Sequence, residues 1–451
     1  MKKKLSFNQN LLIGSLLFGL FFGAGNLIFP VQMGQQAGNH TLIATIGFLI
    51  TGVGLPILGI IASALSRSES LFDMARPVGT KYSTIFTCLL YLTIGPLFAI
   101  PRTATVAFEV GIHPFISDEN LKLGLIIFSL IFFAITIYFS LKPGQILDWV
   151  GKFLTPTFIV LLSILLIATF VSPMGHVSDY AAQGNYVAKP LFTGLLDGYN
   201  TMDALASVAF AIIIISNIQK LGVTDPRSIA VETTKSGLVS VAGMAIIYAS
   251  LAYMGATSLG SVSRADNGGS ILSMVSNHYF GFVGKVLLAA IVIVACVKTA
   301  IGLITSCSEM FSEMFPKSIS YKKYAIAFTL FSFVIANFGL SNLIKFSIPV
   351  LMFLYPLVIT LILLSILAPF IKKQSDVYKW TTGLTIIAAV FDFLKALPES
   401  LQGSVVTNIV SFAAKYLPGF NYGFGWILPA LCGFIIGLII WGVRGNKSTT
   451  V

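Results

Sequence analysis

The sequence predicts an all-α polytopic membrane protein with about twelve membrane-spanning helices. Of its 451 residues, 56% are hydrophobic and only 10% are charged, whereas a soluble protein carries about 25% charged residues. The mean hydropathy is +0.90. Long continuous apolar runs alternate with short polar ones, which indicates spanning helices, since the strands of a membrane barrel would alternate apolar and polar residues.

Twelve apolar runs define the predicted spans. In the first half they lie near residues 10–35, 41–64, 82–106, 121–140, 152–171 and 193–217. In the second half they lie near 236–256, 282–308, 324–342, 344–369, 380–397 and 424–443. We therefore expect one membrane domain over residues 1–451.

The positive charges predict the orientation of these spans. Nineteen of the 28 Lys and Arg residues fall on one side of the predicted membrane and seven on the other. Because positively charged loops remain in the cytoplasm, both termini are expected inside the cell. The net charge of +11 is then a topology signal. No basic cluster with interleaved aromatic residues occurs in the sequence, so no nucleic-acid partner is expected.

The first span carries helix-breaking residues at its midpoint. The stretch "FFGAGNLIFP" (21–30) places Gly23, Gly25 and Pro30 where a membrane helix most needs its backbone hydrogen bonds. The sixth span repeats this feature in "FTGLLDGYNTMDALASVAFAII" (192–213), where Asp197, Gly198, Asn200, Thr201 and Asp203 interrupt the apolar run.

Two broken spans five helices apart predict an inverted repeat of five helices. Because five is odd, the second copy enters the membrane upside down relative to the first, as in many secondary transporters. We expect repeat one near residues 10–171, repeat two near 193–369, and extra helices near 380–443. The alternative is that Ser15, Gly19 and Gly23 form a small-residue packing face and that the Gly and Pro residues only kink the helices.

Broken helices offer backbone groups to a ligand inside the membrane. The half-helix that begins near Gly25 presents amides and a positive dipole end to an anion such as a carboxylate. The half-helices that end near Phe22 and Tyr199 present carbonyls to an ammonium group or a metal cation. A zwitterion matches both ends of such a site.

Six stretches in order along the chain resemble a known family. They are "FFGAGNLIFP" (21–30), "GPLFAIPRTATVAFEVG" (95–111), "VGKFLTP" (150–156), "GYNTMDALA" (198–206), "KTAIGLITS" (298–306) and "FLYPLVI" (353–359). Together they resemble the LIVCS family of bacterial branched-chain amino acid:cation symporters. This family is similar in fold to the LeuT-type transporters, which have an inverted five-helix repeat with broken helices 1 and 6.

The resemblance implies a substrate site at the two breaks. The substrate carboxylate would bind the amides of Ala24 and Gly25, and its amine would meet carbonyls near Phe21, Tyr199 and Asn200. Asn26 and Thr201 complete the expected substrate-binding set. A cation site would use carbonyls of Gly19, Phe22 and Gly302 with hydroxyls of Thr305 and Ser306, which are suitable ligands for Na⁺. The alternative for the hydroxyls is a hydrogen bond to the preceding helical turn.

Three charged residues inside spans have two interpretations each. Lys298 stands where the resemblance implies a neutral residue, often threonine, on the same helix face as Thr305 and two turns away. It either tunes or replaces the cation, or extends toward the outer vestibule. Arg102 has the same ambiguity, with Glu109 as an available partner. Asp203 is the acidic candidate for proton or cation coupling, or it caps a helix.

The predicted function is secondary active uptake of leucine, isoleucine and valine by symport with Na⁺ or H⁺, through alternating access in a bacterial plasma membrane. The expected partners are these three amino acids, the coupling cation and the lipid bilayer, and no cofactor is expected. A carrier for another small zwitterion is the alternative. A membrane enzyme is disfavoured because all four histidines fall in or beside external loops, and a channel is disfavoured because no repeated selectivity filter occurs.

Overall fold

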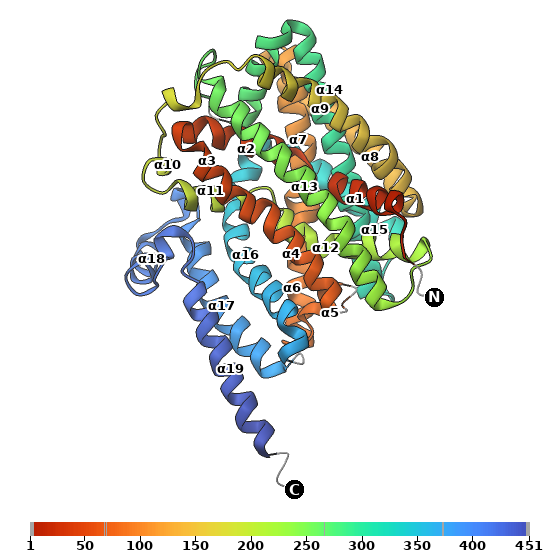
Figure 1. Ribbon diagram of the computed structural model, residues 1–451, viewed down its shortest axis with the longest axis vertical. Helices are drawn as coiled ribbons and strands as arrows, with labels where there is room; N and C mark the ends of the chain where they lie inside the picture. Colours follow the sequence, from red (N-terminus) through yellow and green to blue (C-terminus); the bar gives the residue numbers. More distant parts are fainter. Residues whose placement is uncertain (1–3, 67, 69, 266, 372–373, 448–451) are drawn as a thin grey trace.

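The computed structural model describes the whole chain except residues 1–3, 67, 69, 266, 372–373 and 448–451. Every regular element in the described part is helical. Nine of the described helices are long and apolar enough to cross a membrane, and two shorter apolar helices, Phe7–Phe21 and Ile427–Val443, accompany them. This confirms the all-α polytopic membrane fold (Figure 1).

Each predicted span coincides with a helix or a pair of helices. Spans one to six correspond to α1 (Phe7–Phe21) with α2 (Ala24–Ala37), α3 (Thr41–Leu49) with α4 (Leu55–Leu65), α6 (Thr80–Leu92) with α7 (Ala99–Gly111), α8 (Leu121–Ser140), α9 (Thr155–Val171), and α11 (Pro190–Tyr199) with α12 (Asp203–Lys220). Spans seven to twelve correspond to α13 (Pro226–Ser258), α14 (Gly268–Met314), α15 (Tyr321–Ala336), α16 (Leu340–Ile371), α17 (Ser375–Lys395) and α19 (Ile427–Lys447). The short helices α5 (Leu71–Ala75), α10 (Asn185–Ala188) and α18 (Ser404–Tyr416) lie between spans.

Both predicted helix breaks are present. The first separates α1 from α2 at Phe22 and Gly23. The second separates α11 from α12 at residues 200–202, where Met202 takes a φ of 64°. The structure adds a third irregular region that the sequence analysis does not predict, between α6 and α7. There Gly95 leaves helical geometry next to Pro96, which cannot donate a backbone hydrogen bond.

Small residues allow the helices around the first break to pack closely. A Cβ atom on Gly34 of α2 would lie 1.9 Å from the Ala252 carbonyl oxygen of α13, and one on Gly255 of α13 would lie 2.0 Å from the Val31 carbonyl oxygen of α2. Gly194 of α11 makes the same kind of approach to α3. Close backbone contact through glycine is the usual basis of helix association in membranes, and here it brings the two broken spans near α13 and α3.

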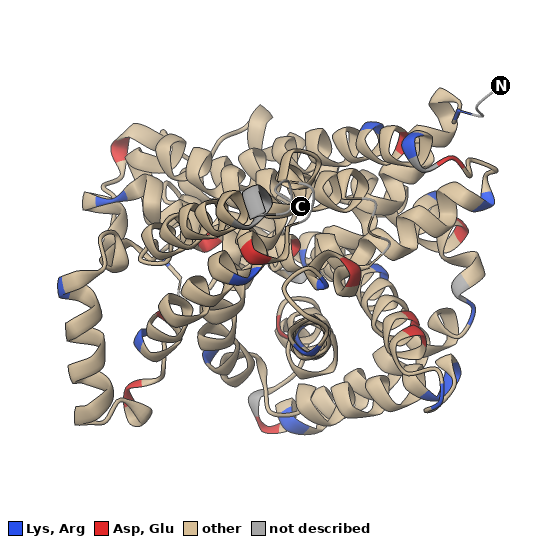
Figure 2. Ribbon diagram, turned by 90° about the horizontal axis from the view of Figure 1, so that it is seen from below, with Lys and Arg blue, Asp and Glu red and all other residues tan. Residues whose placement is uncertain are grey.

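The last three helices lie at one edge of the bundle, where α17 packs against α16. Figure 1 shows α17, α18 and α19 at its lower left, with α19 leading to the C-terminus. Figure 2 shows long helical stretches without charged residues, while Lys, Arg, Asp and Glu gather toward turns and helix ends. Buried ionisable side chains inside the spans, such as Arg102, Asp203 and Lys298, are therefore exceptions that need a physical explanation.

Candidate functional site

The break in the first span exposes the backbone groups of two helix ends. The last hydrogen bond of α1 runs from the Phe22 amide to the Phe18 carbonyl. The next amide, that of Gly23, turns away and donates to Oδ1 of the Asn26 side chain at 2.9 Å. As a result, carbonyls in the last turn of α1 and amides in the first turn of α2 have no partners within their own helices.

A buried hydrogen-bond network joins the two breaks. Asn26 of α2 donates through Nδ2 to Asp203 Oδ2 at 2.6 Å and also to the Tyr248 hydroxyl. Tyr248 of α13 donates to the same carboxylate oxygen at 2.8 Å. Asp203 is the first residue of α12, so its carboxylate also lies at the positive end of that helix. The network fixes the start of α2 against the start of α12.

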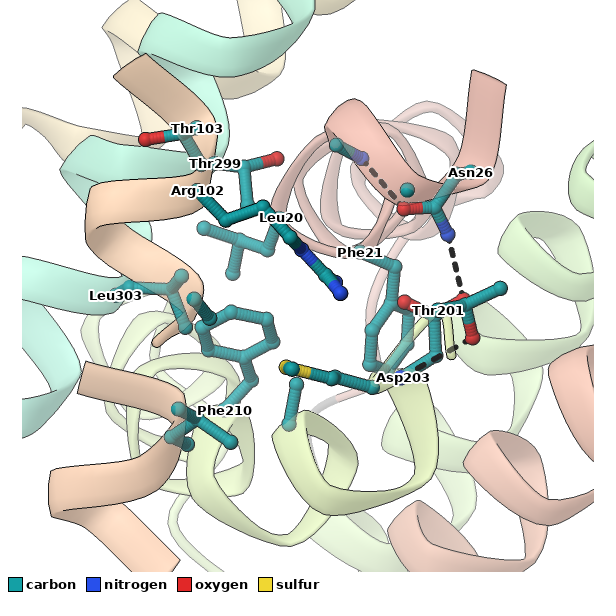
Figure 3. Close-up of a pocket in the computed structure, with 16 residues that line it drawn as sticks. Leu20, Phe21, Asn26, Arg102, Thr103, Thr201, Asp203, Phe210, Thr299 and Leu303 are labelled. Carbon is teal, nitrogen blue, oxygen red and sulfur yellow. Dashed lines mark hydrogen bonds between the residues drawn. The ribbon is translucent and has the colours of Figure 1, made fainter. Parts of the chain in front are cut away.

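A pocket lies between the two breaks (Figure 3). Its apolar lining comes from α1, α12, α14 and the irregular region of the third span, and includes Leu20, Phe21, Ile94, Met202, Ala206, Phe210 and Leu303. Its polar lining includes Gly23, Gly25, Asn26, Arg102, Thr103, Thr201, Asp203 and Thr299. The pocket therefore combines an aliphatic and aromatic wall with one cationic and one anionic side chain.

The Arg102 guanidinium points into this pocket (Figure 3). The side chain is only 6% exposed, and within the described part of the chain no hydrogen bond or ion pair engages it. Its Cζ atom lies 5.7 Å from the centre of the Phe29 ring. A Cβ atom built on Gly25 would lie 3.1 Å from Arg102 Nη2, so the guanidinium stands directly beside the first turn of α2.

The Lys298 ammonium lies at the other side of the break, against the end of α1. Its Nζ atom donates to the carbonyl oxygens of Gly19 at 3.0 Å and Phe22 at 2.5 Å. The neighbouring hydroxyl of Thr299 lies 3.5 Å from the Gly19 oxygen. The Lys298 side chain therefore binds two of the carbonyls that are predicted to bind the coupling ion.

Four of the predicted substrate residues line the pocket, namely Phe21, Gly25, Asn26 and Thr201. Ala24 begins α2, but its side chain is outside the described part. Two others lie elsewhere. The Tyr199 carbonyl accepts a hydrogen bond from the Tyr355 hydroxyl at 2.6 Å, beneath stacked rings, and Asn200 lines a different cavity beside Phe29 and Asp197. The expected amine contacts at the Tyr199 and Asn200 carbonyls stay a prediction.

The predicted cation residues are divided between two places. Gly19 and Phe22 meet Lys298. Gly302 packs against Leu20, where an added Cβ would lie 2.3 Å from Leu20 Cδ2. Thr305 is buried, and Ser306 donates to the Ala209 carbonyl of α12 at 2.9 Å. Thr305 follows Lys298 by seven residues and lies about 10 Å further along α14, and the five-oxygen cation site stays a prediction.

Sodium does not fit at the Gly19 and Phe22 carbonyls as they are arranged here. Both oxygens accept from the Lys298 ammonium, and a second monovalent cation at the same two oxygens would meet its repulsion at close range.

Several residues of the site were not identified from the sequence. The sequence patterns do not single out Thr299, Phe210 or Leu303, and they do not decide the role of Arg102. An available signal was the motif at 95–111, which places Arg102 six residues after the Gly95–Pro96 pair. A helix interruption near a buried arginine is the same kind of signal that revealed the other two breaks.

Comparisons with known proteins agree with the motifs. Residues 6–443 match the family described as Branched-chain amino acid transport protein. The chain is 51% identical over 449 residues to the branched-chain amino acid permease BrnQ of Lactobacillus delbrueckii subsp. lactis, covering 99% of this chain and 100% of that protein. It is 43% identical over 442 residues to the branched-chain amino acid permease BraB of Bacillus subtilis, covering 98% and 97%.

Solved structures show the same fold at low sequence identity. Mhp1, a nucleobase-cation-symport-1 family transporter in a closed conformation with bromovinylhydantoin bound, has a TM-score of 0.58 and 16% identity, covering 97% of this chain and 93% of that chain. MhsT in complex with L-phenylalanine has a TM-score of 0.54 and 15% identity, covering 98% and 99%. These likenesses confirm the LeuT-type fold. The family match confirms a transporter and not an enzyme, and the chain belongs to the branched-chain amino acid transport protein family.

Proposed function

We propose that this protein takes up leucine, isoleucine and valine by cation-coupled secondary active transport, with alternating access to the pocket between the two helix breaks. The observation that carries this proposal is the combination of Arg102, Asp203 and an apolar wall in one buried pocket. One positive and one negative group complement a zwitterion, and the wall complements an aliphatic side chain. The names of the relatives, permeases for branched-chain amino acids, support the same substrates.

The substrate carboxylate binds at the first turn of α2 beside Arg102. The free amides and the helix dipole favour an anion there, and the guanidinium offers a pair of parallel donors that fits a carboxylate. The structure favours this position because Gly25 has no side chain between the helix and Arg102 Nη2. A carboxylate would also relieve the unfavourable burial of an unpaired cation.

The substrate ammonium lies toward the end of α1 and Asp203. Phe21 lines the pocket and lies in the last turn of α1, where carbonyls lack intrahelical partners. Asp203 Oδ2 is held by Asn26 and Tyr248, so its negative charge is fixed at the pocket wall. In this arrangement Asp203 lies near the substrate ammonium and is the acidic candidate for coupling transport to a cation.

The side chain of the substrate packs against Leu20, Phe21, Phe210 and Leu303. These residues supply no hydrogen-bond donor from their side chains. A larger polar amino acid would bury unsatisfied groups there, which costs about 1–3 kcal/mol for each group. Branched aliphatic side chains are therefore favoured over polar ones.

The protein acts in a bacterial plasma membrane with both termini in the cytoplasm, as the distribution of Lys and Arg indicates. The experiment that tests the function is leucine uptake by purified protein in liposomes under imposed sodium, proton or no gradients. Saturable, gradient-driven accumulation that isoleucine and valine inhibit is expected. Non-saturable flux would indicate a channel, and inhibition by alanine or glutamate equal to that by valine would indicate a carrier of different specificity.

A further inference from the structure

Lys298 is a fully buried cation without an acidic partner in contact with it. Its side chain is 0% exposed, and in the described part of the chain neither an ion pair nor a hydrogen bond to a carboxylate engages its Nζ atom. Buried lysines in membrane helices normally face water or pair with an acid. This one is instead held by backbone oxygens.

The two carbonyls that hold Lys298 exist because α1 ends. In a continuous helix, the Gly19 oxygen would accept from the amide of Gly23 and the Phe22 oxygen from that of Asn26. Here the Gly23 amide donates to the Asn26 side chain, and Phe22 is the capping residue of α1. The ammonium therefore satisfies carbonyls that the break leaves free, as a bound metal cation would.

Three aromatic rings complete the cation environment. Nζ lies 4.6 Å from the ring centre of Phe158, 5.6 Å from that of Phe22 and 5.7 Å from that of Phe18. Phe22 packs on both of the other rings, at 5.2 Å and 5.0 Å between centroids. Ring faces stabilise a cation that has lost its water, so α1 and α9 both contribute to the site of this ammonium.

The ionisable groups that act on Lys298 come from two helices. Asp203 of α12 and Cys296 of α14 interact with it electrostatically over a longer range, and Arg102 of α7 interacts with both of these groups. None of these side chains donates to or accepts from Nζ. The carbonyl oxygens and the aromatic rings are thus the direct ligands of the charge.

We propose that Lys298 is a tethered cation that takes the place of a sodium ion between α1 and α14, so that leucine transport by this protein requires no sodium. The inference rests on the proposed uptake function. A tethered charge keeps the end of α1 attached to α14 whether or not sodium is present. Because it cannot dissociate into the cytoplasm, it also cannot draw on a sodium gradient.

The test replaces the lysine with a residue that can act as an ion ligand and with one that cannot. Lys298→Thr removes the ammonium and leaves a hydroxyl on the shorter side chain, beside Thr299. Lys298→Met removes the ammonium without adding an oxygen. Thr305→Ala with Ser306→Ala, made in the Lys298→Thr background, is the matched control on the same helix face.

Two measurements are made for each variant. One is the apparent leucine constant in liposomes when sodium chloride replaces choline chloride at fixed pH and ionic strength. The other is the unfolding midpoint of the purified protein in sodium chloride against potassium chloride, without leucine. A specifically bound ion stabilises the folded state by mass action, so the second measurement needs no transport activity.

The expected result is that the original protein responds to sodium in neither measurement. Lys298→Thr gains sodium dependence, with leucine affinity rising by roughly 5–150-fold, the usual range of coupling between two sites, and with a higher unfolding midpoint in sodium. The Thr305 and Ser306 control keeps this gained response, and Lys298→Met shows none.

A saturable sodium response of the original protein in either measurement overturns the proposal, as does a folded Lys298→Thr variant without one in both. If Lys298→Thr does not fold, the original protein alone decides the matter by its response to sodium. If the original protein does not take up leucine, the proposed function is wrong, but the sodium dependence of the unfolding midpoint still tests the tethered cation separately.

Discussion

Replacing Arg102 with methionine tests whether this residue exists to bind substrate or to support the fold. The guanidinium is 6% exposed and, among the described residues, has no hydrogen-bond or ion-pair partner. Methionine keeps an unbranched side chain in a similar volume and removes the charge. A residue that supports the fold would lower stability when replaced, whereas a residue that binds an anion would lower affinity.

The magnitude follows from the bonds that the substrate carboxylate would lose. Hydrogen bonds to charged groups contribute about 1.5–3 kcal/mol, and each 1.4 kcal/mol is a factor of about ten in affinity. Arg102→Met should therefore weaken leucine binding by roughly 10–150-fold. The unfolding midpoint without substrate should stay the same or rise, because a buried cation without a partner is costly to desolvate. Arg102→Lys should be intermediate, since it keeps the charge and loses the paired donors.

The assay compares leucine with 3-methylbutylamine, which has the same aliphatic chain and amine and lacks the carboxylate. Competition against labelled leucine gives the apparent constants of both compounds in the original protein and in each variant. The original protein should prefer leucine strongly, and Arg102→Met should lose most of that preference. A variant that keeps the full preference for leucine, or that loses stability in parallel with affinity, would refute the reasoning.

Four further predictions concern the break, the network, the packing and the orientation. Gly25→Ala places a Cβ 3.1 Å from Arg102 Nη2 and 3.2 Å from Phe29 Cε2, which costs a strain of about 1–3 kcal/mol. The apparent constant for leucine uptake should therefore rise while the protein yield stays normal. An unchanged constant would place the substrate elsewhere. Tyr248→Phe removes the 2.8 Å hydrogen bond to Asp203 and should lower the free energy of unfolding by about 1–3 kcal/mol. Denaturant titration in detergent measures this change, and equal stability would show that the hydrogen bond contributes nothing. Gly34→Ala should prevent folding because the Cβ would lie 1.9 Å from the Ala252 carbonyl oxygen. The control Gly383→Ala should be tolerated, because no atom lies within 4 Å of its Cβ position. Equal yields of monodisperse protein from the two variants would contradict the close packing of α2 on α13. A fluorescent protein that folds only in the cytoplasm should be bright when fused to the C-terminus, and activity there of a reporter that works only outside the cytoplasm would invert the topology.

The all-α membrane fold and the position of the two main breaks could be predicted from the sequence for a physical reason. In hydrocarbon every backbone polar group needs a partner, so each crossing needs a long apolar helix. For the same reason, residues such as Gly23 and Asn200 in the middle of a span are unusual enough to identify a ligand site. Pocket residues in the breaks themselves, such as Phe21, Gly25 and Thr201, followed from this argument.

The third irregular region was missed because its signal is weaker. Gly95 and Pro96 are only two residues in an otherwise apolar run, and a proline in a membrane helix is often accommodated as a simple kink. Only the structure shows that the helix axis is interrupted there. The orientation of Arg102 into the pocket depends on this interruption, because α7 begins just after it.

By itself, the sequence determined what kind of molecule this is, where its helices break and which face of α14 carries the candidate cation ligands. It could not determine which residues along that face contact α1. Lys298 and Thr305 are seven residues apart, so they share one helix face, and the choice between them depends on how far α14 is displaced along α1. That displacement is set by packing between distant segments, such as Gly302 against Leu20. The tertiary structure alone therefore decided that Lys298, and not Thr305 with Ser306, meets the carbonyls of Gly19 and Phe22.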